Sequence, residues 1–212
     1  MAIRCSRTSG CRQMNPNTSL FLSVNDLARA TPWLHGPLRL YADYGLVVFA
    51  GLLVAGWWIA RRDGDPTRMA AALWAPLGTL LAVAVNQPIV ALVHEARPYD
   101  TLTGILVLAA PTTDPGFPSD HATMAGAVLA GLFLVNRRLG AVAAVAAVLM
   151  ALSRVYIAAH YPLDVAAGLL LGVAVTLAGW ALLRRILIRA VQRMEATPLR
   201  PLLVAAPGAS GS

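Results

Sequence analysis

Long apolar stretches without a single charge constrain this chain more than any other feature of its sequence. Five of them follow one another, at residues 44–60, 69–93, 122–136, 139–153 and 165–183. A helix that crosses the roughly 30 Å hydrocarbon core of a bilayer needs about 20 mostly apolar residues, and each stretch reaches about this length with its flanking residues. The sequence therefore predicts an all-α fold, an integral membrane helical bundle with about five transmembrane helices.

The composition and the charge exclude other classes of protein. Hydrophobic residues make up 58% of the 212 residues and charged residues only 13%, which is too apolar for an ordinary soluble domain. The net charge is +7, but no basic stretch alternates with aromatic side chains, so we expect no nucleic-acid partner. The arginines instead stand at the ends of the apolar stretches, where they orient the spans and meet anionic headgroups.

The chain divides into four parts by composition. Residues 1–16 are expected to form a disordered leader. Residues 17–37 predict an interfacial amphipathic helix and a linker, because apolar positions recur at helical spacing in a segment too polar to span a bilayer. Residues 38–190 hold the transmembrane domain, with its first span over 38–60. Residues 191–212, whose end is rich in Pro, Gly, Ala and Ser, are expected to form a disordered tail.

The placement of arginines predicts the orientation of the bundle, because positively charged loops face the cytoplasm. With five spans, three arginine-rich regions fall on one side: Arg61, Arg62 and Arg68, then Arg137 and Arg138, then Arg184, Arg185, Arg189 and Arg193. The 95–117 connection and the 154–164 turn then face outward, and the apolar patch 102–110 is expected to enter the interface. Arg29 and Arg39 lie on the same outer side, against the rule.

The predicted outer side collects polar residues at the ends of four spans: Arg97, Ser119, His121, Arg154, His160 and Asp164. Charged residues near membrane depth are energetically unfavourable, so they indicate a functional site. Asp164 lies four residues after His160, and Pro162 suits the first turn of a helix. The Asp164 carboxylate can then accept a hydrogen bond from one ring nitrogen of His160, which leaves the other nitrogen unprotonated and aimed at a substrate.

The remaining polar residues are suited to an anion. His121 and Ser119 stand at the start of a span, where free N–H groups and the helix dipole attract negative charge. Arg97 and Arg154 supply forked donors that match phosphate oxygens. His94 matches no such pattern, and we expect it to have a structural role.

Three short motifs carry a resemblance to the type 2 phosphatidic acid phosphatase (PAP2) superfamily. The segment SRVYIAAHYPLD (153–164) matches the third signature, SRxxxxxHxxxD. PSDH (118–121) resembles the second signature, PSGH, and RP (97–98) resembles the end of the first, KxxxxxxRP. The resemblance covers roughly residues 38–190, and its third motif is highly specific in a membrane protein.

Two departures refine the resemblance. Val90 stands where the first signature has its lysine, and Asp120 replaces the glycine of the second. Asn86 is a candidate polar substitute for the lysine. Both changes resemble the bacitracin-resistance branch, the undecaprenyl pyrophosphate phosphatases of cell-wall synthesis, which act on the outer face of the membrane. For Asp120 itself, a salt bridge with an arginine and a role in selecting the substrate are equally expected.

The resemblance implies a mechanism and a set of roles. His160 would attack phosphorus to form a phosphohistidine, Asp164 would orient it, and His121 would protonate the leaving oxygen. Arg97, Ser119 and Arg154 would hold the phosphate oxygens. No metal and no cofactor would be required.

Several functions remain open from the sequence. The leading one is hydrolysis of undecaprenyl or another polyprenyl diphosphate to the monophosphate, at the plasma membrane with the site on the extracytoplasmic side. A phosphatidate or phosphatidylglycerophosphate phosphatase uses the same chemistry. A non-catalytic transporter or scaffold is an alternative of another class, although it has no need to keep His160, Asp164 and Arg154. The expected partners are a lipid phosphate and the bilayer, and the sequence indicates no particular protein partner.

Overall fold

The computed structural model describes residues 15–205, and within this range the chain is helical with no strand. In chain order the elements are α1 (Pro16–Ala30), the short 3₁₀ helix η1 (Pro32–Leu34), α2 (His35–Tyr44), α3 (Leu46–Asp63), α4 (Pro66–Val93), α5 (Pro98–Thr101), α6 (Asp120–Val135), α7 (Arg137–Tyr156), α8 (Pro162–Met194) and α9 (Arg200–Leu203). The predicted all-α class is confirmed.

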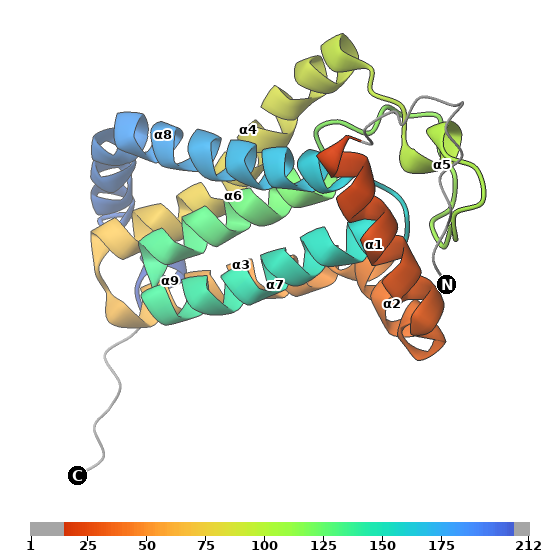
Figure 1. Cartoon of the computed structure of the whole chain (residues 1–212). Coiled ribbons are helices and arrows are strands. Elements are labelled where there is room, and N and C mark those ends of the chain that lie inside the picture. Colours follow the sequence, from red (N-terminus) through yellow and green to blue (C-terminus); the bar gives the residue numbers. More distant parts are fainter. Residues whose placement is uncertain (1–14, 206–212) are drawn as a thin grey trace, which may run out of the picture.

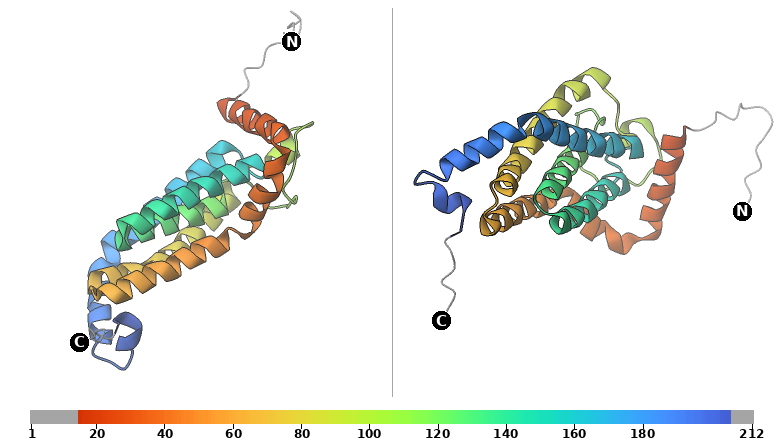
Figure 2. Two further views of the ribbon diagram at one scale, coloured as in Figure 1. Left: turned by 90° about the horizontal axis from the view of Figure 1, so that it is seen from below. Right: turned by 90° about the vertical axis from the view of Figure 1, so that its left-hand side faces the viewer.

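Five long helices form the bundle, with α6 packed against α4, α7 and α8 (Figures 1 and 2). Glycines let α6 and α8 approach backbone to backbone. A Cβ atom on Gly172 would lie 2.0 Å from the carbonyl oxygen of Thr123, and one on Gly126 would lie 2.2 Å from that of Leu169. Small residues at helix contacts are typical of membrane bundles, in which close packing rather than water exclusion holds the helices together.

Three helices of the described range are long and apolar enough to cross a bilayer, and a bent pair makes a fourth. The three contain α4, α7 and α8, and the bent pair joins the η1–α2 segment to α3 at an angle of 56°. The shorter α6, with 16 residues, completes the five-helix bundle. The first span, expected over 38–60, thus falls on this bent pair of helices rather than on one continuous helix. The bend lies at Gly45, where a Cβ atom would come within 2.5 Å of Met150 Cε on α7.

The N-terminal helix predicted from the sequence is present as α1 and lies across one end of the bundle (Figure 1). The buried Asn25 side chain makes two bonds to the backbone of Leu106, at 2.7 and 3.0 Å. The apolar patch 102–110 therefore packs against α1. The Ile157 carbonyl holds the end of this patch, because it accepts hydrogen bonds from the N–H groups of both Leu108 and Ala109.

The prediction of a disordered tail is wrong for residues 191–205. Helix α8 continues to Met194, and α9 then folds back towards α3. Leu203 is buried in an apolar cluster, and Arg61 Nε donates to the Pro201 carbonyl at 2.7 Å. Most of the expected leader, residues 1–14, and the last tail residues, 206–212, lie outside the described residues, whereas Pro16 already belongs to α1.

Candidate active site

The polar residues singled out in the sequence gather at the end of the bundle that α1 covers. A cavity of about 690 Å³ opens there, between α2, α4 and the 95–117 connection. Four of the six predicted residues line it, namely Arg97, His121, Arg154 and His160. Ser119 and Asp164 are buried beside it, with no exposed surface.

His160 lies in the tight turn between α7 and α8 and is only 3% exposed. Its Nδ1 atom lies 2.8 Å from the carbonyl oxygen of Gly116. A carbonyl can only accept, so Nδ1 carries the proton and Nε2 keeps its lone pair. Burial, together with the charges of Arg154 and Arg97, lowers the pKa of His160 to about 3. The imidazole is therefore neutral at physiological pH, as a nucleophile requires.

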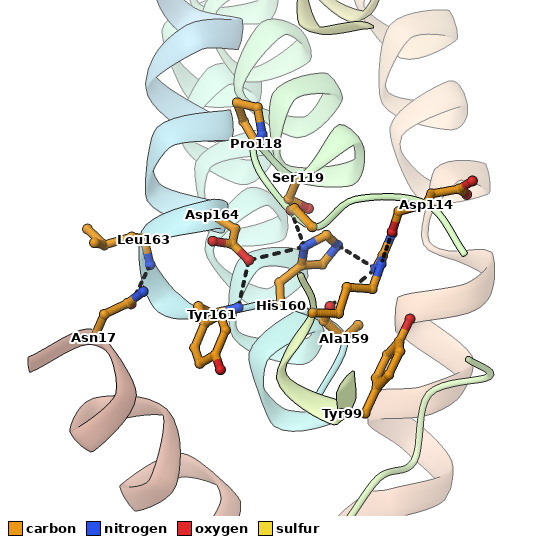
Figure 3. Close-up of polar contacts among 12 residues, drawn as sticks. Asn17, Tyr99, Asp114, Pro118, Ser119, Ala159, His160, Tyr161, Leu163 and Asp164 are labelled. Atoms are coloured by element: carbon orange, nitrogen blue, oxygen red, sulfur yellow. Dashed lines mark hydrogen bonds and ion pairs between the residues drawn. The ribbon is translucent and has the colours of Figure 1, made fainter. Parts of the chain in front are cut away.

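Asp164 stands beside this imidazole but does not make the hydrogen bond predicted for it. Its Oδ2 lies 3.5 Å from His160 Nδ1 and instead accepts from the Tyr161 N–H at 2.8 Å (Figure 3). The carboxylate thus caps the start of α8, and the Gly116 carbonyl takes the orienting bond to the ring. The prediction missed Gly116 because a backbone acceptor has no side-chain signal, although it lies in the Pro- and Gly-rich run just before the PSDH motif.

Arg97 lies across the free nitrogen of His160. Its Nη1 is 3.4 Å from His160 Nε2 and donates to the Ala159 carbonyl at 3.2 Å, while Nε donates to the Asp114 carbonyl at 2.8 Å. These backbone acceptors fix the guanidinium without neutralising its charge. An anion placed against Nε2 would therefore meet a positioned cation.

Arg154 supplies a second cation to the same cavity. Its guanidinium makes one long contact of 3.5 Å to the Ala42 carbonyl, and its buried Nε has no partner. Within residues 15–205, the arginines paired with a carboxylate are Arg39 and Arg68, not Arg97 or Arg154. Two arginines without carboxylate partners around a neutral histidine nitrogen form a site for an anion.

The two predicted residues at the start of α6 differ in their access to the cavity. His121 lines it, in the first turn of the helix. Ser119 is fully buried, its hydroxyl has no partner, and it does not line the cavity. His121 and His160 therefore line the cavity together with the two arginines, whereas the Ser119 hydroxyl lies behind the cavity wall.

Asp120, which departs from the family pattern, contacts Asn86, the candidate substitute for the family lysine. Asn86 is fully buried, and its Nδ2 donates to the Pro118 carbonyl at 3.2 Å and to Asp120 Oδ1 at 2.6 Å. Gln87 Nε2 donates to the same oxygen at 3.0 Å. Asn86 therefore cannot replace the lysine as a phosphate ligand, because it does not reach the cavity. The salt bridge considered for Asp120 is not formed, since amides rather than an arginine hold this carboxylate. Val90 does line the cavity.

Comparison with known proteins identifies a family and several relatives. The sequence profile of the PAP2 superfamily matches residues 71–187. The chain is 29% identical to the bacitracin transport permease protein BcrC of Bacillus licheniformis, over 74% of this chain and 75% of that protein. It is 26% identical to the undecaprenyl-diphosphatase BcrC of Bacillus subtilis (75% and 80%), and 31% identical to the putative undecaprenyl-diphosphatase YbjG of Escherichia coli (74% and 78%).

Two solved structures share the fold. The crystal structure of Aquifex aeolicus LpxE aligns with a TM-score of 0.57 and 24% identity, over 79% of this chain and 96% of that one. A transmembrane PAP2 type phosphatidylglycerolphosphate phosphatase from Bacillus subtilis aligns with the same TM-score and 19% identity, over 85% and 88%. The helical bundle is thus also the fold of a transmembrane PAP2 type phosphatase.

Proposed function

This chain belongs to the PAP2 superfamily and is a multi-pass membrane phosphatase acting on a lipid phosphate, and from that premise we propose that its substrate is undecaprenyl diphosphate or a similar polyprenyl diphosphate. The product is the polyprenyl monophosphate, with release of inorganic phosphate. The relatives named as undecaprenyl-diphosphatases support this choice, as does the exchange of the family lysine and glycine for Val90 and Asp120.

In the first step, His160 Nε2 attacks the terminal phosphorus. A bond forms between Nε2 and phosphorus, and the bond from phosphorus to the bridging oxygen breaks. Bound diphosphate places negative charge beside His121 and favours its protonated form. His121 gives this proton to the departing oxygen, so the lipid monophosphate leaves without building up further charge. The ring of the phosphohistidine carries a positive charge, because Nδ1 keeps its proton against the Gly116 carbonyl. Asp164, 3.5 Å from Nδ1, stabilises that charge.

In the second step, water attacks phosphorus on the side that the leaving group vacated. His121, now neutral, accepts a proton from this water, and the bond from phosphorus to Nε2 breaks. Inorganic phosphate departs and His160 returns to its neutral form. Arg97 and Arg154 offset the charge on the phosphoryl oxygens in both steps.

One observation carries this proposal above all others. Two arginines, neither paired with a carboxylate, lie beside a buried histidine nitrogen that holds a lone pair. A transporter or scaffold has no use for an activated nucleophile held by a backbone carbonyl. A phosphate group bound in the cavity would accept hydrogen bonds from these arginines and would lie within reach of Nε2.

We further propose that the cavity faces the extracytoplasmic side. The arginine-rich loops lie at the opposite end of the bundle, where α3 joins α4, α6 joins α7, and α8 ends. The positive-inside rule places that end in the cytoplasm. The cavity then opens where a lipid carrier used in building the cell wall would be recycled.

Phosphate release from purified protein tests the substrate. We expect faster release from C55 and C50 prenyl diphosphates than from phosphatidate or phosphatidylglycerophosphate under the same detergent conditions. His160→Ala is the matched control and should release none. Faster hydrolysis of phosphatidylglycerophosphate would overturn the proposed substrate while leaving the chemistry intact.

A further inference from the structure

The carboxylate of Asp120 is an anomaly in a cavity that binds phosphate, because like charges repel. It forms part of the cavity wall, on the same helix turn as His121. Its position is not accidental, since two amide groups from successive residues of α4, Asn86 and Gln87, converge on Oδ1 at 2.6 and 3.0 Å. The chain thus fixes a negative charge beside its own anion site.

The two amides also determine what the carboxylate can do. An amide N–H₂ group only donates, so both bonds stabilise Oδ1 as an acceptor. Oδ2 makes no protein hydrogen bond among the described residues and is free to accept a further one. A phosphate oxygen can donate to it only if that oxygen carries a proton.

We propose that Asp120, held by Asn86 and Gln87, is a specificity-determining residue that accepts a hydrogen bond from a protonated phosphate oxygen and disfavours fully ionised phosphate. This inference rests on the proposed function and deepens it. The site would hold a terminal phosphate with one proton more tightly than one with none. Inorganic phosphate would dissociate more easily once it has lost its second proton to bulk water.

The surroundings of Asp120 are consistent with this selection. The other charged and titratable groups around the cavity are Asp43 of α2, His94 at the end of α4, Arg97 and Asp114 of the connection, His121, and Arg154 and His160. The two arginines supply the attraction that any phosphate needs. Asp120 is the cavity carboxylate that Asn86 and Gln87 fix in place. Asp43 instead pairs with Arg39 at 3.7 Å.

Binding of radiolabelled inorganic phosphate to the purified protein, measured from pH 5.5 to 8.5, tests the proposal without relying on turnover. For the unchanged protein we expect the Kd to rise steeply above neutral pH, where phosphate loses its second proton. Asp120→Asn should tighten binding by about tenfold at pH 8.5 and flatten the pH profile, because the like-charge repulsion is removed. Gln87→Met, which removes one of the two amides, should flatten the profile in part.

Asp43→Asn is the matched control, since it removes a negative charge from the same cavity. Because Arg39 already offsets the charge of Asp43, this substitution should change the slope far less than Asp120→Asn does. A slope that Asp120→Asn leaves unchanged, or that Asp43→Asn flattens equally, overturns the role of Asp120. If the unchanged protein binds no phosphate at any pH, the proposed active site itself is wrong, so the two failures are distinct. If Asp120→Asn does not fold, an unaltered slope in Gln87→Met overturns the inference.

Discussion

Replacement of Asp164 by asparagine should slow formation of the phosphohistidine without unfolding the protein. Asp164 Oδ2 lies 3.5 Å from His160 Nδ1. When Nε2 bonds to phosphorus, the ring becomes cationic, and the carboxylate then stabilises the product of that step. The substituted asparagine can still accept from the Tyr161 N–H through its amide oxygen, so the cap of α8 survives.

The size of the effect follows from this distance. Two unit charges 3.5 Å apart attract by about 5 kcal/mol at an effective dielectric constant of about 20, and by about 1 kcal/mol in bulk water. Asp164 is buried but the adjoining cavity is open, so we expect a loss between these limits, about 3 kcal/mol. That corresponds to a rate about 150-fold lower.

Rapid-quench measurement of a single turnover gives this rate directly. Asp100→Asn is the matched control, because its exposed carboxylate lies outside the cavity wall, and it should keep the rate of the unchanged protein. Thermal unfolding should show both variants folded. A rate for Asp164→Asn within threefold of the unchanged protein would refute the electrostatic role.

Four further predictions can be checked independently. His160→Ala should abolish turnover in a folded protein. His121→Ala should reduce turnover of an activated aryl phosphate less than that of a prenyl diphosphate, because an aryl oxygen needs little protonation to leave. Steady-state turnover of both substrates by both variants tests this. Nitrogen NMR should find His160 neutral and protonated at Nδ1 down to about pH 4, since its pKa is lowered to about 3. The folded protein keeps His160 neutral, whereas the unfolded chain takes up a proton below about pH 6.5. The free energy of unfolding should therefore fall as the pH drops from about 6.5 towards 3. A titration midpoint near 6.5 would contradict the geometry. Phosphate release should persist in excess EDTA, because no cluster of metal-ligating side chains occurs within the described part of the chain; loss of activity that magnesium restores would be the opposite result. In a chain without its two native cysteines, an impermeant thiol reagent should label Thr103→Cys from outside intact cells and not Thr67→Cys, and the reverse pattern would invert the orientation.

The sequence was most informative where the bilayer penalises a residue. Charge is so unfavourable in hydrocarbon that a polar residue at the end of a span indicates a site, and Arg97, His121, Arg154 and His160 do meet around one cavity. The five-helix bundle was predictable for the same reason, because the length of an apolar stretch is read directly against the thickness of the membrane.

What the sequence could not supply depends on the path of the backbone. The orienting bond to His160 comes from the Gly116 carbonyl, and every residue has a carbonyl. A salt bridge with an arginine was one of two interpretations of Asp120. Its actual partners, the amides of Asn86 and Gln87, depend on how α4 turns against the start of α6. The ordered segment after Met194 was missed because Leu203 finds its apolar contacts only in the folded protein.

The bonds that α1 makes have a consequence for how this protein is made. Asn17, near the first described residue, accepts from the N–H of Leu163, and Asn25 holds the backbone of Leu106. Synthesis proceeds from the N-terminus, so α1 leaves the ribosome long before either of its partners. These contacts can form only after the start of α8 has been synthesised, so we expect the packing of α1 against the turn that holds His160 to be a late step of folding. A nascent chain that ends before this turn also lacks His160, so we expect it to be inactive.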